Sequence, residues 1–300
     1  MTVDKLEPAE PTPLTEYKIH EHGFIRLVDR MGDDHSICDA ARVSYGKGTR
    51  NVNDNRNLIR YLLKHRHTTP FEMCELKFHI KLPIFVMRQH IRHRTASTNE
   101  YSGRYSIMKD EFYVPAEDYI QPQSKTNKQG REGVVSDGQK KHIISLLDSH
   151  HASTYDLYSI LAGEKEPEQD IGWVMGEDYP GMARESARGV LPVSNYTECY
   201  WKINLHNLMH YLGLRMDSHA QREIRDYADA MYKLIEPWYP ASMEAFQDYK
   251  FQSKTFSRME LEVLSNLLIG LDTSEVEKMC QEKNMSKRET VEFVSWFGQS

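Results

Sequence analysis

Several features that would assign this chain to a familiar class are missing from its sequence. Its four cysteines, Cys38, Cys74, Cys199 and Cys280, are far apart and form no CxxC pair, so neither a disulfide framework nor a thiolate zinc site is indicated. No apolar run approaches the roughly 18 residues of a membrane span. The formal charge of −6 argues against a protein that holds a nucleic-acid polymer by bulk positive charge.

The first residues also lack the pattern of an export signal. The stretch MTVDKLEPAEPTPLTEY is acidic and proline-rich, whereas a signal peptide begins basic and continues apolar. We therefore expect a cytoplasmic protein with reduced cysteines and no membrane contact. What the sequence does contain is material for a core, because its 300 residues are 39% hydrophobic and 10% aromatic, which is enough for one large domain or two ordinary ones.

Hydrophobic periodicity predicts a mixed architecture. Strands are expected over 23–29, 75–83 and 196–203, and in the second of these apolar and polar residues alternate, which indicates a half-buried strand. Helices are expected between and after them, with Pro83 in the first turn of one. The predicted helices cover 33–45, 53–65, 83–93, 138–163, 204–214, 218–238, 258–271 and 287–297.

These elements predict an α+β fold with a peripheral C-terminal helical extension. We expect a flexible N-terminal segment over 1–20, a main domain over 21–250 and the extension over 251–300. An acidic tract with several glycines and prolines, 164–181, interrupts the main domain. His150 and His151 fall on the long helix 138–163 and are expected at the surface.

A cluster of basic side chains stands out in this acidic chain. Residues 88–94, RQHIRHR, hold three guanidiniums and two imidazoles. Bound anions would reduce the repulsion between these clustered positive charges. On a helix, Arg88 and Arg92 would share one face. The simpler alternative is a solvated basic helix end that complements the helix dipole.

The residues that follow favour a binding site. The stretch RHRTASTNEYSGRY, 92–105, has no sustained apolar period and is expected as a polar loop. Gly103 would let backbone amides approach a ligand. Glu100 would repel phosphates, but it suits a position beside an arginine or beside ribose hydroxyls and base N–H groups. A nucleotide has a phosphate, a ribose and a base, so it fits the loop.

The same stretch resembles the RHRxxSxNExSxRY signature of the flavin-dependent thymidylate synthases and matches it at every fixed position. Further similar stretches occur in the same order: HTTPFE at 67–72, ARGVLP with Arg188, and LRMDSHAQ at 214–221. The resemblance covers roughly residues 20–250. The matching positions of the signature are Arg92, His93, Arg94, Ser97, Asn99, Glu100, Ser102, Arg104 and Tyr105.

The resemblance implies a fold, an activity and an assembly. Family members have a central, mainly antiparallel sheet with helices packed around it. They convert dUMP to dTMP in nucleotide biosynthesis, with 5,10-methylenetetrahydrofolate as carbon donor and an FAD that NADPH reduces, and they bind FAD without a GxGxxG motif. They are homotetramers with sites built across subunits.

Site residues carry over position by position from the resemblance. Arg215 resembles the activating arginine of the family, a fixed cation beside the uracil. His206 stands where the family usually has an arginine, so contacts to FAD are expected to differ there. The implied FAD contacts are Thr69, Arg92, His93, Arg94, Glu100, Asn204, His206, His210 and His219. The implied dUMP contacts are Gln89, Arg92, Glu100, Tyr101, Ser102, Gly103, Arg104, Arg188 and Arg215.

Other interpretations of individual residues are weaker. His206 and His210 have the spacing of a metal pair, but no HExxH glutamate or third ligand accompanies them. Cys74 and Cys199 are candidate nucleophiles by their residue type, yet Cys74 stands at the opening of a predicted strand and Cys199 lies inside another. Ser102 has no paired base within the motif, which favours a binding role.

Two other classes of protein remain as alternatives. A nucleotide-binding regulatory module without turnover would keep the phosphate-binding arginines but would not need Glu100, Arg215 and His219 together. A sugar-phosphate or nucleotide hydrolase would need a metal or a pair of carboxylates, which the sequence does not offer. Flavin content separates the first alternative from the enzyme.

Overall fold

The computed structural model describes residues 15–43, 55–126, 130–165, 179–267 and 272–295. Two compact units make up the chain, one of residues 1–46 with 68–240 and the other of residues 47–67 with 241–300. The first unit contains the sheet and most of the residues expected at a site. Most of the expected flexible N-terminal segment, residues 1–14, lies outside the described residues, as do 166–178 of the acidic tract.

One antiparallel sheet forms the centre of the first unit. Its strand order is β1-β2-β3-β5-β4, and every pair of neighbours is antiparallel. The predicted α+β class and the three predicted strands are confirmed. The five strands are β1 (Glu16–Ile19), β2 (Gly23–Met31), β3 (Glu75–Pro83), β4 (Ala96–Glu100) and β5 (Tyr196–Asn204).

The expectation that β3 is half-buried is wrong for its second half. His79 and Lys81 are buried, because β3 is the central strand and has β2 and β5 on its two sides. Carboxylates pair with both side chains: His79 lies 2.6 Å from Glu198, and Lys81 lies 2.6 Å from Glu111. Polar residues can be buried here because each has a partner.

The polar signature is also not entirely a loop, since residues 96–100 form strand β4 at the sheet edge. Four of its five residues are exposed, so no alternation of apolar and polar residues marked it as a strand in the sequence. Its pairing with β5 fixes its course.

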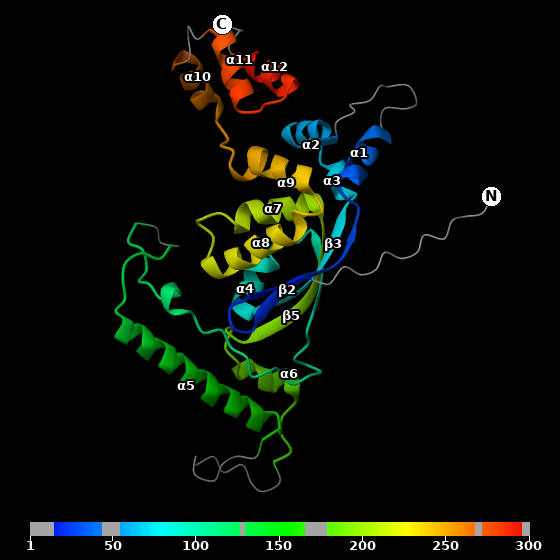
Figure 1. Cartoon of the computed structure of the whole chain (residues 1–300). Coiled ribbons are helices and arrows are strands. Elements are labelled where there is room, and N and C mark those ends of the chain that lie inside the picture. Colours follow the sequence, from blue (N-terminus) through cyan, green and yellow to red (C-terminus); the bar gives the residue numbers. More distant parts are fainter. Residues whose placement is uncertain (1–14, 44–54, 127–129, 166–178, 268–271, 296–300) are drawn as a thin grey trace, which may run out of the picture. The chain divides into compact units, whose positions relative to one another are not determined.

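Helices α4, α7 and α8 pack against the sheet (Figure 1). In the register of β3 and β5, Phe78 is paired with Trp201, and both are fully buried. The hydroxyl of Tyr227 on α8 donates to the carbonyl of Lys81 at 2.8 Å. The helices of this unit are α1 (Asp34–Val43), α3 (Thr69–Glu72), α4 (Ile84–His90), α5 (Asp137–Leu161), α6 (Arg184–Ala187), α7 (Leu205–Arg215) and α8 (Arg222–Ile235).

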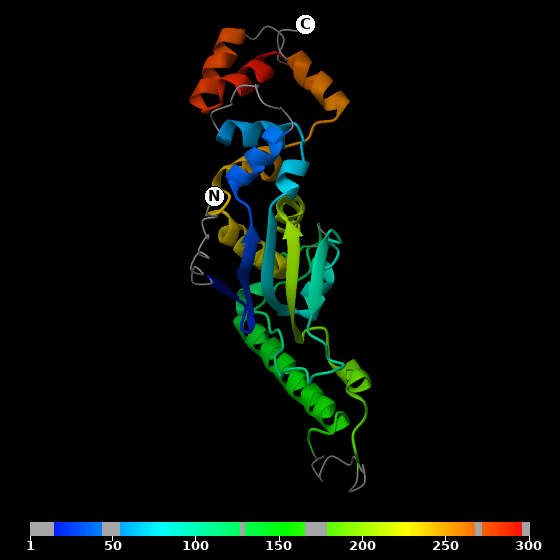
Figure 2. The same cartoon turned by 90° about the vertical axis from the view of Figure 1, so that its right-hand side faces the viewer.

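The long helix α5 begins with a capping box formed by Ser136 and Gln139, and Figure 2 shows its length. The surface position expected for His151 on this helix is wrong. Its ring stacks on Phe112 with centroids 4.7 Å apart, and its Nε2 lies 2.9 Å from the hydroxyl of Ser194. His150 is exposed as expected.

The second unit is helical, and its described part contains two helices, α9 and α11, that the sequence did not indicate. No described helix of either unit is long and apolar enough to cross a membrane. The elements are α2 (Asn55–Lys64), α9 (Pro240–Phe246) with a π-helical turn (Gln247–Phe251), α10 (Arg258–Leu267), α11 (Thr273–Glu282) and α12 (Lys287–Val294).

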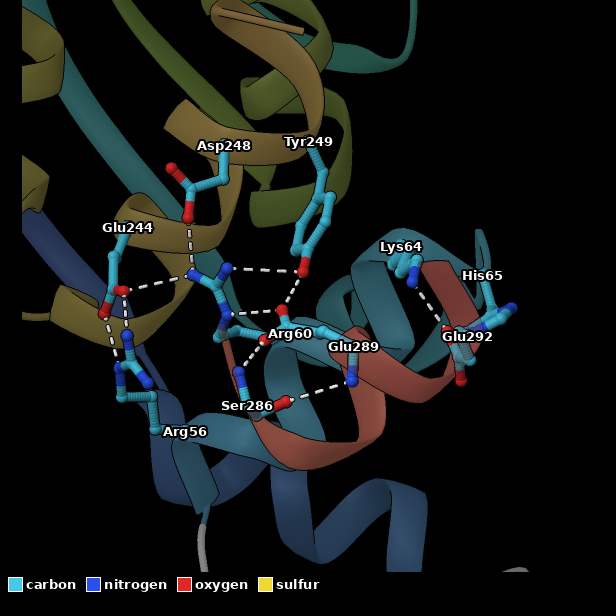
Figure 3. A network of polar contacts seen from close by, with 10 residues as sticks. All are labelled: Arg56, Arg60, Lys64, His65, Glu244, Asp248, Tyr249, Ser286, Glu289 and Glu292. Carbon is cyan, nitrogen blue, oxygen red and sulfur yellow. Dashed lines mark hydrogen bonds and ion pairs between the residues drawn. The ribbon is translucent and has the colours of Figure 1, made fainter. Parts of the chain in front are cut away.

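A buried arginine holds the parts of the second unit together (Figure 3). Arg60 of α2 donates to Glu289 of α12 at 2.8 Å, to Asp248 at 2.6 Å, to Glu244 at 3.0 Å and to the hydroxyl of Tyr249 at 3.2 Å. Only 8% of the Arg60 side chain is exposed, so these acceptors, rather than water, stabilise its positive charge.

Candidate functional site

Arg215, the last residue of α7, lies at the centre of a hydrogen-bonded group. Its Nε donates to Nε2 of His93 at 3.1 Å, and its Nη2 donates to the backbone carbonyl of Gln89 at 3.4 Å. The amide of Gln89 donates to Oε1 of Gln221 at 2.6 Å. Three of these residues, Gln89, His93 and Arg215, were expected at the site, and the fold brings them together. The four residues are called the Arg215 group below.

His93 is held in its neutral form. Burial, and after it the neighbouring Arg215 and His210, lower the pKa of His93 to about 4. The guanidinium Nε always carries a hydrogen, so Nε2 of His93 is the acceptor and the ring proton lies on Nδ1. The ring of Tyr211 stands against His93 with centroids 4.7 Å apart. Arg215 is thus a fixed cation beside an uncharged imidazole.

A second group forms around the turn after β4. Nε of Arg104 donates to a carboxylate oxygen of Glu185 at 3.2 Å, and Nε of Arg188 donates to the backbone carbonyl of Glu185 at 3.3 Å. A Cβ at Gly103 would lie 2.8 Å from Sδ of Met108 and 3.1 Å from Cδ of Arg188, so glycine permits a close approach. Two exposed guanidiniums beside such a turn can bind a phosphate by forked hydrogen bonds. These five residues are called the Arg104 group.

The other residues of the signature turn are oriented locally. Glu100 accepts a hydrogen bond of 2.8 Å from the hydroxyl of Thr197, whereas the sequence had also allowed an arginine as its partner. The hydroxyl of Tyr101 donates to the carbonyl of Ile107 at 2.7 Å. Ser102 accepts from the backbone N–H of Arg104 at 3.4 Å, which agrees with a binding role.

The residues expected around FAD lie on several elements. Arg92 and Arg94 are exposed on both sides of His93. Asn204 caps α7, and its Oδ1 accepts from the backbone and side-chain N–H groups of Asn207 at 2.9 Å each. The side-chain N–H groups of Asn204 remain as donors toward a ligand. Thr69 opens α3, which packs against α7.

The three expected histidines differ in their surroundings. His206 is half-buried in the first turn of α7, and His210 is exposed with its ring centroid 6.0 Å from that of His93. His219 is also exposed, and its Nδ1 lies 2.8 Å from a carboxylate oxygen of Asp217. Within the described ranges, no cluster of three or more His, Cys, Asp or Glu residues could hold a metal ion.

The cysteine thiols are poorly placed for attack on a substrate. Burial raises the pKa of Cys74 to about 11 and that of Cys199 to about 12. Nearby carboxylates raise both values further. At neutral pH both groups are therefore thiols, whereas the thiolate is the nucleophile.

Sequence reasoning did not identify two residues of these groups as functional. Gln221 lies in the matched stretch 214–221, but only the fold reveals that it accepts from Gln89. Glu185 precedes the ARGVLP stretch and carried no signal, because its partner Arg104 is distant in sequence. Between the Arg215 group and the Arg104 group, no hydrogen bond or ion pair is seen in the part of the chain that the structure describes.

The residues present fit a flavin dinucleotide. Arg92 and Arg94 offer exposed positive charge for a diphosphate, and their side chains form no ion pair with any described residue. The free N–H donors of Asn204 at the start of α7 suit the oxygens of the same ligand. A neutral His93 between the two arginines adds no further charge.

Comparisons with known proteins indicate one family. The family model described as thymidylate synthase complementing protein matches residues 26–241. The flavin-dependent thymidylate synthase of Rickettsia bellii is 50% identical, with 92% of each chain covered, and that of Ruegeria pomeroyi is 46% identical, with 94% of this chain and 89% of the relative covered.

A solved structure extends the agreement to the fold. The UMP/dUMP methylase PolB of Streptomyces cacaoi, bound with 5-Br UMP, aligns with a TM-score of 0.65 at 32% identity and covers 78% of this chain and 98% of its own. A second structure of PolB, bound with 5-Br dUMP, aligns equally well at 30% identity. This chain belongs to the family of the flavin-dependent thymidylate synthases, and it is an enzyme of that kind.

Proposed function

We propose that this chain methylates dUMP reductively to dTMP. In this reaction 5,10-methylenetetrahydrofolate donates the carbon, NADPH reduces a bound FAD, and tetrahydrofolate is the folate product. The observation that carries the proposal is the fixed guanidinium of Arg215, which the neutral His93 and the carbonyl of Gln89 hold in place. The family relationship supports the substrate and the flavin.

Arg215 is assigned the activation of the uracil. A cation held beside the ring stabilises the negative charge that develops on it, which makes C5 of the uracil nucleophilic. Because two hydrogen bonds fix the guanidinium in advance, little reorganisation is needed during the reaction. Gln89 belongs to the same group and is assigned to contact dUMP.

The Arg104 group is assigned to the phosphate of dUMP. The existing pair of Arg104 and Glu185 is exposed on both sides, so it contributes little stability, and a dianionic phosphate can replace the carboxylate. The N–H groups of the turn at Ser102 and Gly103 add neutral donors. Arg188 supplies the second guanidinium, which binds the same phosphate by forked hydrogen bonds.

The flavin is assigned to Arg92, His93 and Arg94, together with Glu100 and the start of α7 at Asn204. When bound, this cofactor supplies the hydride that completes the methyl group. The arginines bind and orient its phosphates. Thr69, His206, His210 and His219 complete the proposed set of flavin contacts.

We further infer a homotetramer that acts in the cytoplasm. Sites shared between subunits would explain why, among the described residues, no hydrogen bond links the Arg215 group with the Arg104 group of one chain. The free, buried cysteines suit a reducing compartment. Light scattering on the purified protein tests the assembly, and a mass below four times that of one chain would reject it.

The test of the function is a turnover assay on purified, FAD-loaded protein. dTMP should form only when dUMP, methylenetetrahydrofolate and NADPH are all present, and UMP in place of dUMP reports the choice of sugar. Cys74→Ala and Cys199→Ala should keep turnover, since no thiol attacks the uracil. Colourless protein that takes up no added FAD would refute the proposal and favour a nucleotide-binding module.

A further inference from the structure

A cavity of about 340 Å³ opens in the first unit at the start of α8, beside the Arg215 group. It adjoins the group through Gln221, the residue before α8. Its lining carries the guanidiniums of Arg131, Arg222 and Arg225, with His219 at its side, against one carboxylate, that of Asp118. Positive charge gathered around a cavity in a chain of net charge −6 indicates an anionic ligand.

Two of the three arginines are fixed in place by carboxylates. Arg131 donates to both carboxylate oxygens of Glu223 at 2.6 Å. Arg222 donates to Asp118 at 2.7 Å and lies over the ring of Tyr119 at 3.8 Å. A guanidinium has five N–H donors, so each pair leaves donors for a further acceptor.

The third arginine has an unused donor. Nε of Arg225 is buried but meets no hydrogen-bond acceptor among the described residues. Burial raises the pKa of Asp229, one turn further along α8, and the charge of Arg225 opposes this shift. The two side chains form no ion pair. A buried donor without an acceptor is costly. The terminal N–H groups of Arg225, which lines the cavity, also form no hydrogen bond with a described residue and can donate to a ligand oxygen.

Gln221 occupies the N-cap position of α8 without capping the helix through its side chain, because its Oε1 accepts from Gln89. The carboxylate of Glu223 lies in the first turn, so the positive end of the helix dipole is already complemented from within the chain. The guanidiniums around the cavity are therefore the groups that attract an anion, and their forked donors match the several oxygens of a phosphate dianion better than a single carboxylate.

We propose that this cavity binds the 2′-phosphate of the nicotinamide reductant. The assignment to NADPH rests on the proposed function, in which dUMP takes the Arg104 group and FAD takes Arg92 and Arg94. The phosphates of NADPH are then without a place, and among them the 2′-phosphate is the terminal dianion. The volume is near the lower limit of small-molecule pockets and suits one phosphorylated ribose rather than a whole dinucleotide. His219 borders both this cavity and the proposed flavin contacts.

Direct binding tests the subsite independently of turnover. Adenosine 2′,5′-bisphosphate is titrated into the full chain by calorimetry, with 5′-AMP as the probe that lacks the 2′-phosphate. The bisphosphate should bind more tightly than 5′-AMP, and Arg225→Ala should weaken it about 10- to 100-fold, as expected for a hydrogen bond to a charged group. Lys233→Ala removes an exposed cation elsewhere on α8 and should leave the affinity within twofold.

Kinetics then separate the reductant from other anions. Arg225→Ala should raise the KM for NADPH about 10- to 100-fold and the KM for NADH less than twofold. Equal affinity of wild type and Arg225→Ala for the bisphosphate, equal losses for NADPH and NADH, or a rise confined to the KM for the folate would each overturn the assignment. If the protein bound the bisphosphate through Arg225 but did not turn over dUMP, the proposed function would fail while the phosphate subsite stood.

Discussion

Nε of Arg215 donates a hydrogen bond of 3.1 Å to Nε2 of His93. This contact joins the end of α7 to the basic stretch after α4, which are far apart in the sequence. Since the imidazole accepts, it must be neutral, and its lowered pKa of about 4 agrees with that requirement. The positive charge at this point therefore belongs to Arg215 alone, and its direction is fixed before any substrate binds.

Replacing this arginine should affect the chemical step. Arg215→Ala should lower kcat by about 10²–10³-fold, because a cation that meets developing charge acts mainly in the transition state. Steady-state kinetics with dUMP, alongside the visible spectrum to verify flavin content, measure the effect. His150→Ala, an exposed site on α5, is the control, and an unchanged kcat in Arg215→Ala would remove its assigned role.

Changes in the Arg104 group should instead affect the binding of dUMP. Gly103→Ala places a Cβ 3.1 Å from Cδ of Arg188 and 2.8 Å from Sδ of Met108, so the arginine must move. We expect the KM for dUMP to rise about tenfold or more, since a small misplacement of a binding group is costly. Arg104→Ala should have a similar effect on KM. Gly138→Ala, where an added Cβ meets no atom within 4 Å, should leave KM unchanged.

The stability of the protein should fall in acid through His90, which lies beside the site. Burial is the main cause that lowers the pKa of His90 to about 3, and the neighbouring His93 and Arg215 lower it further. The unfolded chain, with an ordinary histidine pKa of about 6.5, binds the proton more readily. The stability that neutral His90 contributes to the folded protein is thus complete above pH 6.5 and is lost as the pH falls toward 3. In this range the free energy of unfolding decreases by at most about 1.4 kcal/mol per pH unit.

Urea unfolding at pH 7.0, 5.5 and 4.5 checks this linkage. His90→Phe keeps an aromatic ring against Trp201, which lies 4.3 Å away between centroids, and should show a shallower pH dependence than the wild type. His150→Ala should keep the wild-type slope. Equal slopes for His90→Phe and the wild type would contradict the assignment.

Much of the fold was readable from local patterns. Predicted strands and helices correspond to β2, β3, β5, α5, α7 and α8, because the spacing of their apolar residues marks each element in the sequence. Strand β4 was missed, since both of its faces are largely exposed and only its pairing with β5 makes it a strand. His151 was misjudged because Ser194 and Phe112, its neighbours, come from distant segments.

For the candidate site, the family resemblance indicated residues but not contacts. It indicated Gln89, His93 and Arg215, and the fold joins these three residues. It gave no indication that Gln221 orients Gln89 or that Glu185 pairs with Arg104. Such contacts depend on the tertiary fold and leave no period or spacing in the sequence.

The association of α2 with the C-terminal segment could not be read from the sequence either. Arg60 and Glu289 are 229 positions apart, and residues 47–67 group with residues 241–300 in one unit. Burial on its own would raise the pKa of Glu289, but hydrogen bonds from Tyr249, Ser286 and Arg60 lower it to about 2. The carboxylate is therefore charged and buried, and it depends on its partners.

Removing Arg60 should destabilise the second unit strongly. Arg60→Met leaves Glu289 as an uncompensated buried charge, which should lower the free energy of unfolding by about 3–5 kcal/mol. Arg258→Ala breaks only an exposed ion pair and should lower it by less than about 0.5 kcal/mol. The double variant Arg60→Met/Glu289→Leu removes both buried charges and should recover part of the loss, because Glu244 and Asp248 are partly exposed and can be hydrated. Urea unfolding of the three variants measures these differences.

Two outcomes would contradict this account of the buried arginine. An Arg60→Met protein as stable as Arg258→Ala would mean that Arg60 does not hold α2 to α12. A double variant less stable than Arg60→Met would mean that Glu289 contributes more than its charge.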